Sequence, residues 1–132
     1  MKHAETEVRA TLRRMLANGP LTALPRRPRD LQMFLTLAAA RFEAQRAYSE
    51  PQVNELLQAW LGPFASPCGV DHVTVRRCLV DARLLIRNRT GSTYERAGRV
   101  SVPAGVEPAA IMAEVQLERE KRKRAHSARP GQ

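Results

Sequence analysis

The fold of this chain is decided by residues 49–96, which read SEPQVNELLQAWLGPFASPCGVDHVTVRRCLVDARLLIRNRTGSTYER. Ser49 and Gln52 have the spacing of a capping box, in which two side chains satisfy backbone N–H groups at the start of a helix. Apolar residues then recur along one helical face, at Val53, Leu56, Leu57, Trp60 and Leu61. The pattern predicts a helix that ends before Gly62.

A second helix and a hairpin are predicted to follow. Residues 62–69 are rich in proline and glycine and form a loop, after which Asp71 opens a helix over residues 71–83. Residues 84–96 contain two β-prone arms around a turn in which Gly91 can adopt a positive φ. Helix, turn, helix and hairpin in this order are the layout of a winged helix-turn-helix, which presents one helix and one hairpin to a duplex groove.

Further helices are predicted on both sides of this unit. Residues 4–17 carry an apolar stripe of Val8, Leu12, Met15 and Leu16. After a proline-rich connector, Asp30 is expected to cap a core helix. That helix has Leu31, Phe34, Leu35, Ala38 and Phe42 at helical spacing. Residues 109–125 are helix-prone and become basic toward their end.

These patterns give a mainly α-helical organisation. We expect an N-terminal amphipathic helix in residues 1–20, a winged-helix domain over 24–97, a linker over 98–108, and a basic helix with a disordered tail over 109–132. The residues expected to be buried are Phe34, Leu35, Leu57, Trp60, Leu79 and Leu85.

The composition narrows the class of partner. A chain of 132 residues is one domain with extensions. Its net charge is +9 and almost all cations are arginine, which forms bidentate bonds with phosphate or guanine. The charge favours a polyanionic partner, although an arginine-rich solvated surface would have the same composition. No apolar run is long enough to span a bilayer and no secretory segment is visible, so we expect a cytoplasmic protein without a membrane partner.

From Leu24 through Arg96 the chain resembles a bacterial family known as domain of unknown function 2087. The residues that carry the resemblance are Tyr48 to Glu50, Val53 to Leu57, Asp71, His72, Thr74, Arg76, Arg77, Leu79 to Asp81, Leu85 to Arg87, Gly91, Ser92 and Tyr94. The resemblance implies a winged-helix-like domain, in some members joined to a regulator-type helix-turn-helix or an acetyltransferase, and no established reaction. Members usually carry an aromatic residue where this chain has Cys78 and leucine where it has Val75, which implies a less bulky core around the second helix.

The second helix has two different faces. Val75, Cys78, Leu79 and Ala82 share one side, while Val73, Arg77, Val80 and Asp81 lie opposite, with Thr74 and Arg76 on the flanks. If the second face enters the major groove, an arginine can reach guanine and a valine can meet a thymine methyl group. The candidate DNA contacts, including those of the hairpin, are Thr74, Arg76, Arg77, Val80, Arg87, Arg89 and Arg96.

Other interpretations of these residues stay open. Arg76 and Arg77 are solvated in one of them, or pair with Glu50, Glu55 or Asp81. In another, outward Val73 and Val80 form a protein-protein interface without nucleic-acid binding. The basic C-terminal tail gives only electrostatic attraction to RNA, because no aromatic residues are interleaved with its cations.

Catalytic and metal chemistry find little support. Cys68, His72 and Cys78 lie close in sequence, but no fourth zinc ligand is nearby, and two cytosolic cysteines are expected to stay reduced. No serine has a paired base and no glycine-rich phosphate loop occurs. We therefore expect no catalytic residue, no metal and no cofactor.

The sequence thus favours a DNA-binding protein that regulates transcription in bacteria and lies with the nucleoid in the cytoplasm. Its 71–83 helix would read the major groove of double-stranded DNA, and its 84–96 hairpin would hold the backbone. The stripe in residues 4–17 suggests a homodimer through the terminal helices, or alternatively a helix that closes the core of a monomer.

Overall fold

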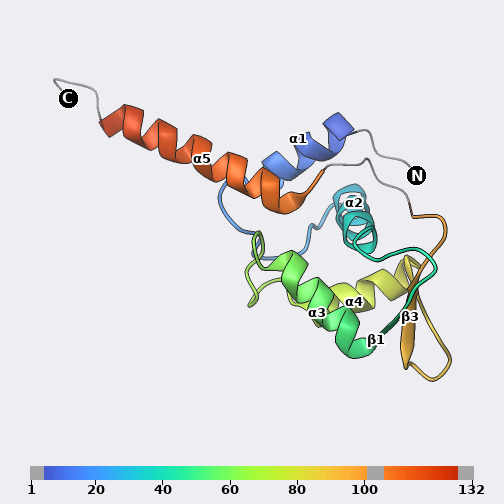
Figure 1. The fold of residues 1–132 in the computed structure, drawn as a ribbon. Helices are drawn as coiled ribbons and strands as arrows, with labels where there is room; N and C mark the ends of the chain where they lie inside the picture. The colour runs from blue at the N-terminus through green and yellow to red at the C-terminus, as the bar shows by residue number, and fades with distance from the viewer. Residues whose placement is uncertain (1–4, 101–105, 128–132) are drawn as a thin grey trace.

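A computed structural model describes residues 5–100 and 106–127 of the chain (Figure 1). The described elements are α1 (Glu5–Met15), α2 (Pro28–Ala39), β1 (Ala47–Ser49), α3 (Glu50–Leu61), α4 (His72–Asp81), β2 (Leu85–Arg87), β3 (Thr93–Arg96) and α5 (Pro108–Ser127). This part of the chain is mainly helical, with a three-stranded antiparallel sheet in the order β1-β3-β2. The arrangement is compatible with a winged-helix-like fold.

Helices α3 and α4 form where the sequence predicts them. Ser49 and Gln52 make the predicted capping box: the Ser49 hydroxyl accepts from the Gln52 N–H, and the Gln52 side chain accepts from the Ser49 N–H. The loop between the helices is held by the connector that precedes α2. Leu21 donates its N–H to the Phe64 carbonyl at 2.9 Å and accepts from the Ser66 N–H at 2.7 Å. These bonds hold the loop between α3 and α4 in place, so α4 can keep a fixed orientation although the loop is long.

The sheet contains one strand that the sequence analysis missed. The predicted hairpin is present as β2 and β3, but β1 adds a third strand, with Tyr48 opposite Tyr94. Three residues are too few to show the alternation that marks a strand, and β1 ends at the residue that caps α3. Tyr48 is buried against Phe42, with ring centroids 5.0 Å apart, and its hydroxyl accepts from the Glu43 N–H.

The predicted cap of α2 is wrong. The helix begins at Pro28, so Asp30 lies in its first turn, and Arg27 at the cap position makes no side-chain cap bond. Proline is favoured at the first helical position because its missing N–H would have no partner there. Asp30 instead accepts two bonds from the Arg14 guanidinium of α1.

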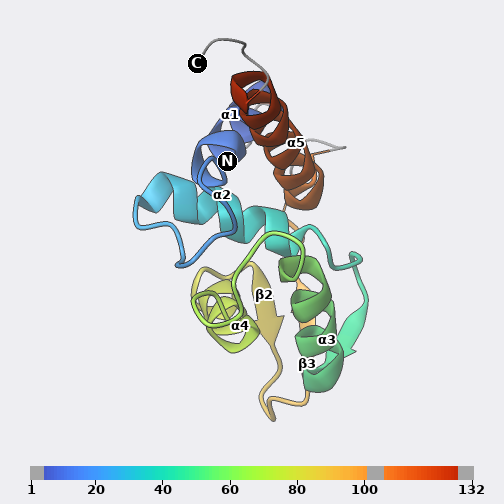
Figure 2. The same cartoon turned by 90° about the vertical axis from the view of Figure 1, so that its left-hand side faces the viewer.

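One hydrophobic core joins all the helices. The six residues predicted to be buried are buried: Phe34, Leu35, Leu57, Trp60, Leu79 and Leu85. Helix α2 runs between the α1 and α5 pair on one side and α3, α4 and the sheet on the other (Figure 2). Phe34 contacts Trp60 and Phe64, with ring centroids 5.4 and 6.3 Å away, where α2 meets α3 and the loop. The terminal helices therefore share the core of the central unit.

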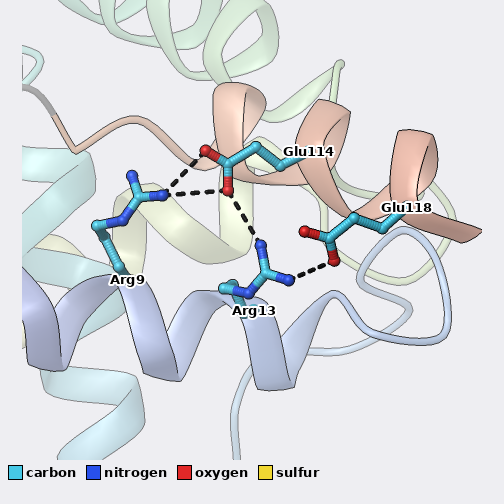
Figure 3. A network of polar contacts seen from close by, with 4 residues as sticks. All are labelled: Arg9, Arg13, Glu114 and Glu118. Carbon is cyan, nitrogen blue, oxygen red and sulfur yellow. Dashed lines mark hydrogen bonds and ion pairs between the residues drawn. The ribbon is translucent and has the colours of Figure 1, made fainter.

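Helices α1 and α5 pack against each other within the chain. Val8 and Leu12 of α1, with Leu16 directly after the helix, are buried in the same cluster as Ile111, Met112 and Val115 of α5. An ion-pair network lies beside this contact (Figure 3): Arg9 and Arg13 both bind Glu114, and Arg13 also binds Glu118. The apolar stripe that suggested a homodimer is thus covered within one molecule, as the alternative interpretation expected.

Parts of three predictions concern residues outside the described part of the chain. These are residues 1–4 of the predicted N-terminal region 1–20, residues 101–105 of the predicted 98–108 linker and residues 128–132 of the predicted disordered tail. The helix predicted over residues 109–125 extends to Ser127, the last residue of α5. Among the described helices, none combines the length and apolar character that crossing a bilayer requires.

Candidate nucleic-acid interface

The start of α4 is fixed by Asp71, as predicted. Its carboxylate accepts the Thr74 N–H at 2.8 Å and the Thr74 hydroxyl at 2.9 Å. These two bonds, the backbone one first, hold the pKa of Asp71 below its ordinary value. The Thr74 side chain is exposed at the N-terminal end of α4, although its hydroxyl is already bonded to Asp71.

The faces of α4 agree with the predicted wheel only in part. Val75 and Leu79 are fully buried, and Arg77 is exposed on the other side. Val73 and Val80 were placed on the free face but are half-buried, and Val80 packs against the core. The wheel treats the helix as isolated, whereas neighbouring elements cover part of its free side. Cys78 is half-buried. Burial, and to a smaller extent the nearby Asp81 carboxylate, raises the pKa of its thiol.

Arg76 connects α4 to α3. Its guanidinium lies 3.2 Å from a Glu50 carboxylate oxygen and donates to the Asn54 side chain. Only 13% of the Arg76 side chain is exposed. The same Glu50 oxygen accepts from the Tyr94 hydroxyl at 3.2 Å, so one carboxylate joins α3, α4 and β3. This geometry agrees with the interpretation in which Arg76 pairs with Glu50 and leaves it little freedom to reach a phosphate.

A hollow of about 380 Å³ lies between α4 and the hairpin. Its lining residues are Glu50, Arg76, Arg77, Val80, Asp81, Arg87 and Tyr94. Arg77 and Arg87 approach it from the helix and the hairpin respectively, and both are exposed. Neither guanidinium has a carboxylate within 4.0 Å among the residues that the structure describes, so both can accept an anionic partner.

The hairpin tip is organised by Asn88. Its side-chain oxygen accepts the N–H groups of Ser92 and Thr93 at 2.8 and 3.2 Å, and its amide donates to the Ser92 hydroxyl. Gly91 has φ of +73°, as expected for the predicted turn, and the Arg87 guanidinium lies over it. Arg89 is exposed at this tip. The tip therefore exposes Arg89 on a turn whose conformation is held by the hydrogen bonds of Asn88.

Arg96 lies apart from this group. It pairs in register with Leu85, near the base of the hairpin, and is half-buried. Its guanidinium donates to the Phe42 carbonyl at 3.0 Å. The structure therefore brings Arg77 and Arg87 together around one hollow and leaves Arg89 exposed at the hairpin tip, while Arg76 and Arg96 are engaged in contacts within the fold.

Two contributors to this face were absent from the predicted set. Asn54 and Tyr94 hold the Arg76–Glu50 group, but nothing in the sequence spacing of three separate elements could assign them partners. In the described ranges, no cluster of three histidine, cysteine or acidic side chains has the arrangement of a metal site. Cys68 is exposed, Cys78 is half-buried, and both are free thiols.

Comparison with known proteins gives a family but no closer relative. No curated protein and no solved structure is significantly similar to the chain. A family model described as uncharacterized protein conserved in bacteria, domain of unknown function 2087, matches residues 20–96. The match spans the connector, α2, β1, α3, α4 and the hairpin, and confirms the resemblance seen in the sequence. Because it covers more than half of the chain, the protein belongs to this bacterial family.

Proposed function

We propose that the protein binds double-stranded DNA through α4 and the β2–β3 hairpin and regulates transcription. The observation that carries the proposal is the group of exposed cations Arg77, Arg87 and Arg89, which lie on adjoining elements without carboxylate partners in the described part of the chain. Such a group costs self-repulsion in the free protein, and phosphate groups would relieve it.

The shapes of the two elements suit a duplex. Helix α4 has ten residues and is about 15 Å long, a size that the major groove admits. A hairpin beside such a helix can follow the neighbouring backbone or minor groove. In this arrangement Arg77 reads base edges, whereas Arg87 and Arg89 hold phosphates. Thr74 and Val80 lie on the same helix as secondary contacts.

The engaged arginines have a different role in the proposal. Arg76 positions α4 through Glu50 and Asn54, and Arg96 supports the base of the hairpin through the Phe42 carbonyl. A homodimer is not needed to form this face, because α4 and the hairpin belong to one molecule. A cytoplasmic location with the nucleoid follows from the proposed partner.

The test compares two cations of the face with one outside it. Arg77→Ala should lose about 1–3 kcal/mol on a preferred sequence and relax selectivity, because one base contact is removed. Arg89→Ala should weaken all sequences alike and lower the salt slope by about one unit, because one phosphate contact is removed. Arg29→Ala removes an exposed arginine of α2 and serves as the charge-matched control. Unchanged binding in both test variants would contradict the proposed face.

A second candidate function is a protein-interaction module. The observation in its favour is Ile86, which is 59% exposed on β2 opposite Glu95 of β3. An exposed apolar side chain gains free energy when a partner covers it. Val73 and Val80, which the sequence suggested as its contacts, are half-buried. Absence of DNA binding at low salt, with loss of partner capture in Ile86→Ser, would select this candidate.

A further inference from the structure

The second half of α5 projects beyond the rest of the molecule. Both views show α5 leaving the body at the end opposite the hairpin (Figures 1 and 2). Every residue from 116 to 126 is exposed. At 1.5 Å per residue, this segment is on the order of 16 Å long. It is a helix without tertiary packing along most of its length.

The side of α5 that faces the core changes from apolar to basic as the helix leaves the body. Met112 and Val115 are buried, and Arg119 and Lys123 occupy the following positions along the same side at i+4 spacing. Arg122 lies next to them. We name the cations of this segment the basic arm: Arg119, Lys121, Arg122, Lys123 and Arg124. The first part of α5 therefore packs against the core, and the later part forms an exposed, positively charged surface.

Packing of α5 against α1 leaves this surface strongly positive. The segment contains two carboxylates, and one of them, Glu118, is paired with Arg13 of α1 (Figure 3). Glu114, one turn earlier, is held by Arg9 and Arg13, which lower its pKa. Glu120 is thus the carboxylate that remains beside five cations in residues 116–126.

The helix dipole does not account for the whole cluster. Cations are favourable within the last turn of a helix, but that effect fades over one turn, and Arg119 and Lys121 lie before the last turn of α5. Like charges three and four positions apart, as at Arg119, Arg122 and Lys123, disfavour the helix. An anionic partner would remove this repulsion and stabilise the projecting segment.

We propose that the basic arm binds the phosphate backbone of a second duplex segment, so that one molecule holds two segments at opposite ends. The proposal rests on the proposed function of α4 and the hairpin, which would hold the first segment. A nucleic acid fits better than a lipid surface, because Leu117 is the sole large exposed apolar residue in residues 116–126 and a membrane-binding helix needs an apolar face. The lack of a single cationic face suits a contact with the backbone without base reading.

The experiment measures capture of one duplex by another. A duplex with the preferred sequence is fixed to beads, the full chain is added, and capture of a fluorescent random duplex is recorded between 50 and 200 mM salt. The parent should capture the second duplex. The triple variant Arg119→Gln, Arg122→Gln, Lys123→Gln should lose capture by about tenfold or more while it still binds the fixed duplex. Its salt slope on random DNA should fall by about 2–3 units.

A charge-matched control and three outcomes make the test decisive. The control variant Arg26→Gln, Arg27→Gln, Arg29→Gln removes the same charge from the connector and α2 and should retain capture. Full capture by the arm variant, or none by a parent that binds the fixed duplex, overturns the arm but leaves the proposed function. Parent binding to vesicles of phosphatidylglycerol and phosphatidylcholine that the arm variant loses, without duplex capture, also overturns it. If Arg77→Ala and Arg89→Ala bind normally and the arm variant loses all DNA binding, the proposed function fails, and with it the binding of two segments by one molecule, and the basic arm is the single DNA contact.

Discussion

Two adjacent arginines of α4 should affect the stability of the fold to different extents when each is replaced. Arg76 is 13% exposed and bonded to Glu50 and Asn54, whereas Arg77 is exposed and has no carboxylate partner in the described residues. Arg76→Ala should therefore destabilise the fold, and Arg77→Ala should leave it nearly unchanged. Both variants remove one positive charge from neighbouring positions of the same helix, so they differ mainly in the contacts that the removed guanidinium makes.

The magnitude follows from the geometry. Hydrogen bonds to charged groups contribute about 1.5–3 kcal/mol, and removal of Arg76 leaves Glu50 and Asn54 with one partner fewer. Glu50 is 45% exposed, so water replaces part of that contact and the expected cost is about 1–2 kcal/mol. In a domain of this size the loss lowers the melting temperature by about 3–8 °C. Arg77→Ala should stay within about 0.5 kcal/mol of the parent.

Urea unfolding followed by far-ultraviolet circular dichroism measures both variants. A lower midpoint with an unchanged m-value in Arg76→Ala reports a true loss of stability. As a control, Arg76→Ala is repeated in a Glu50→Gln background, where its cost should shrink because the charged partner has been removed. Equal midpoints for Arg76→Ala and Arg77→Ala would refute the assignment of Arg76 to the fold.

Three further predictions concern the same region. Leu79→Ala should cost about 2–5 kcal/mol because the leucine is fully buried, and a thermal shift near zero would show that the buried face of α4 is misassigned. Asp71→Ala should cost about 1 kcal/mol at pH 7 through loss of the helix cap. Because the pKa of Asp71 is lowered in the folded protein, this stability difference should be complete above about pH 4 and shrink as the pH falls through the folded pKa. A stability difference that does not change between pH 2 and 7 would contradict the role of the carboxylate. A thiol reagent at pH 8 should modify exposed Cys68 first and Cys78 slowly, since burial raises the pKa of Cys78; survival of the fast phase in Cys68→Ser would reverse that order.

Most features with local signals were predictable from the sequence, and the cap predicted at Asp30 is the exception. The capping box at Ser49, the Asp71 cap and the turn at Gly91 each depend on a few neighbouring residues, and the structure confirms all three. Periodicity likewise identified the buried positions, because the pattern of a helix face extends over several turns. These local signals define α3, α4 and the hairpin, of which the last two form the candidate interface.

Features that depend on distant partners were not predictable. Strand β1 exists because Tyr48 pairs with Tyr94, and the pairing of Arg76 with Glu50 and Asn54 requires the crossing of α3 and α4. The sequence permitted Arg76 to be either a phosphate contact or an ion-pair partner, and no local signal chooses between them. Sequence reasoning could place cations on α4 and the hairpin, but not decide which ones the fold engages.

The central claim is that α4 and the hairpin bind duplex DNA, and a salt titration tests it most directly. Fluorescence anisotropy is recorded for the full chain with a duplex selected from bacterial genomic fragments and with a random duplex, between 50 and 200 mM salt. The account predicts steep salt dependence for both duplexes and a selected sequence bound about 10³-fold or more tightly than the random one. Absence of binding to either duplex at 50 mM salt would contradict the account and favour the protein-interaction module.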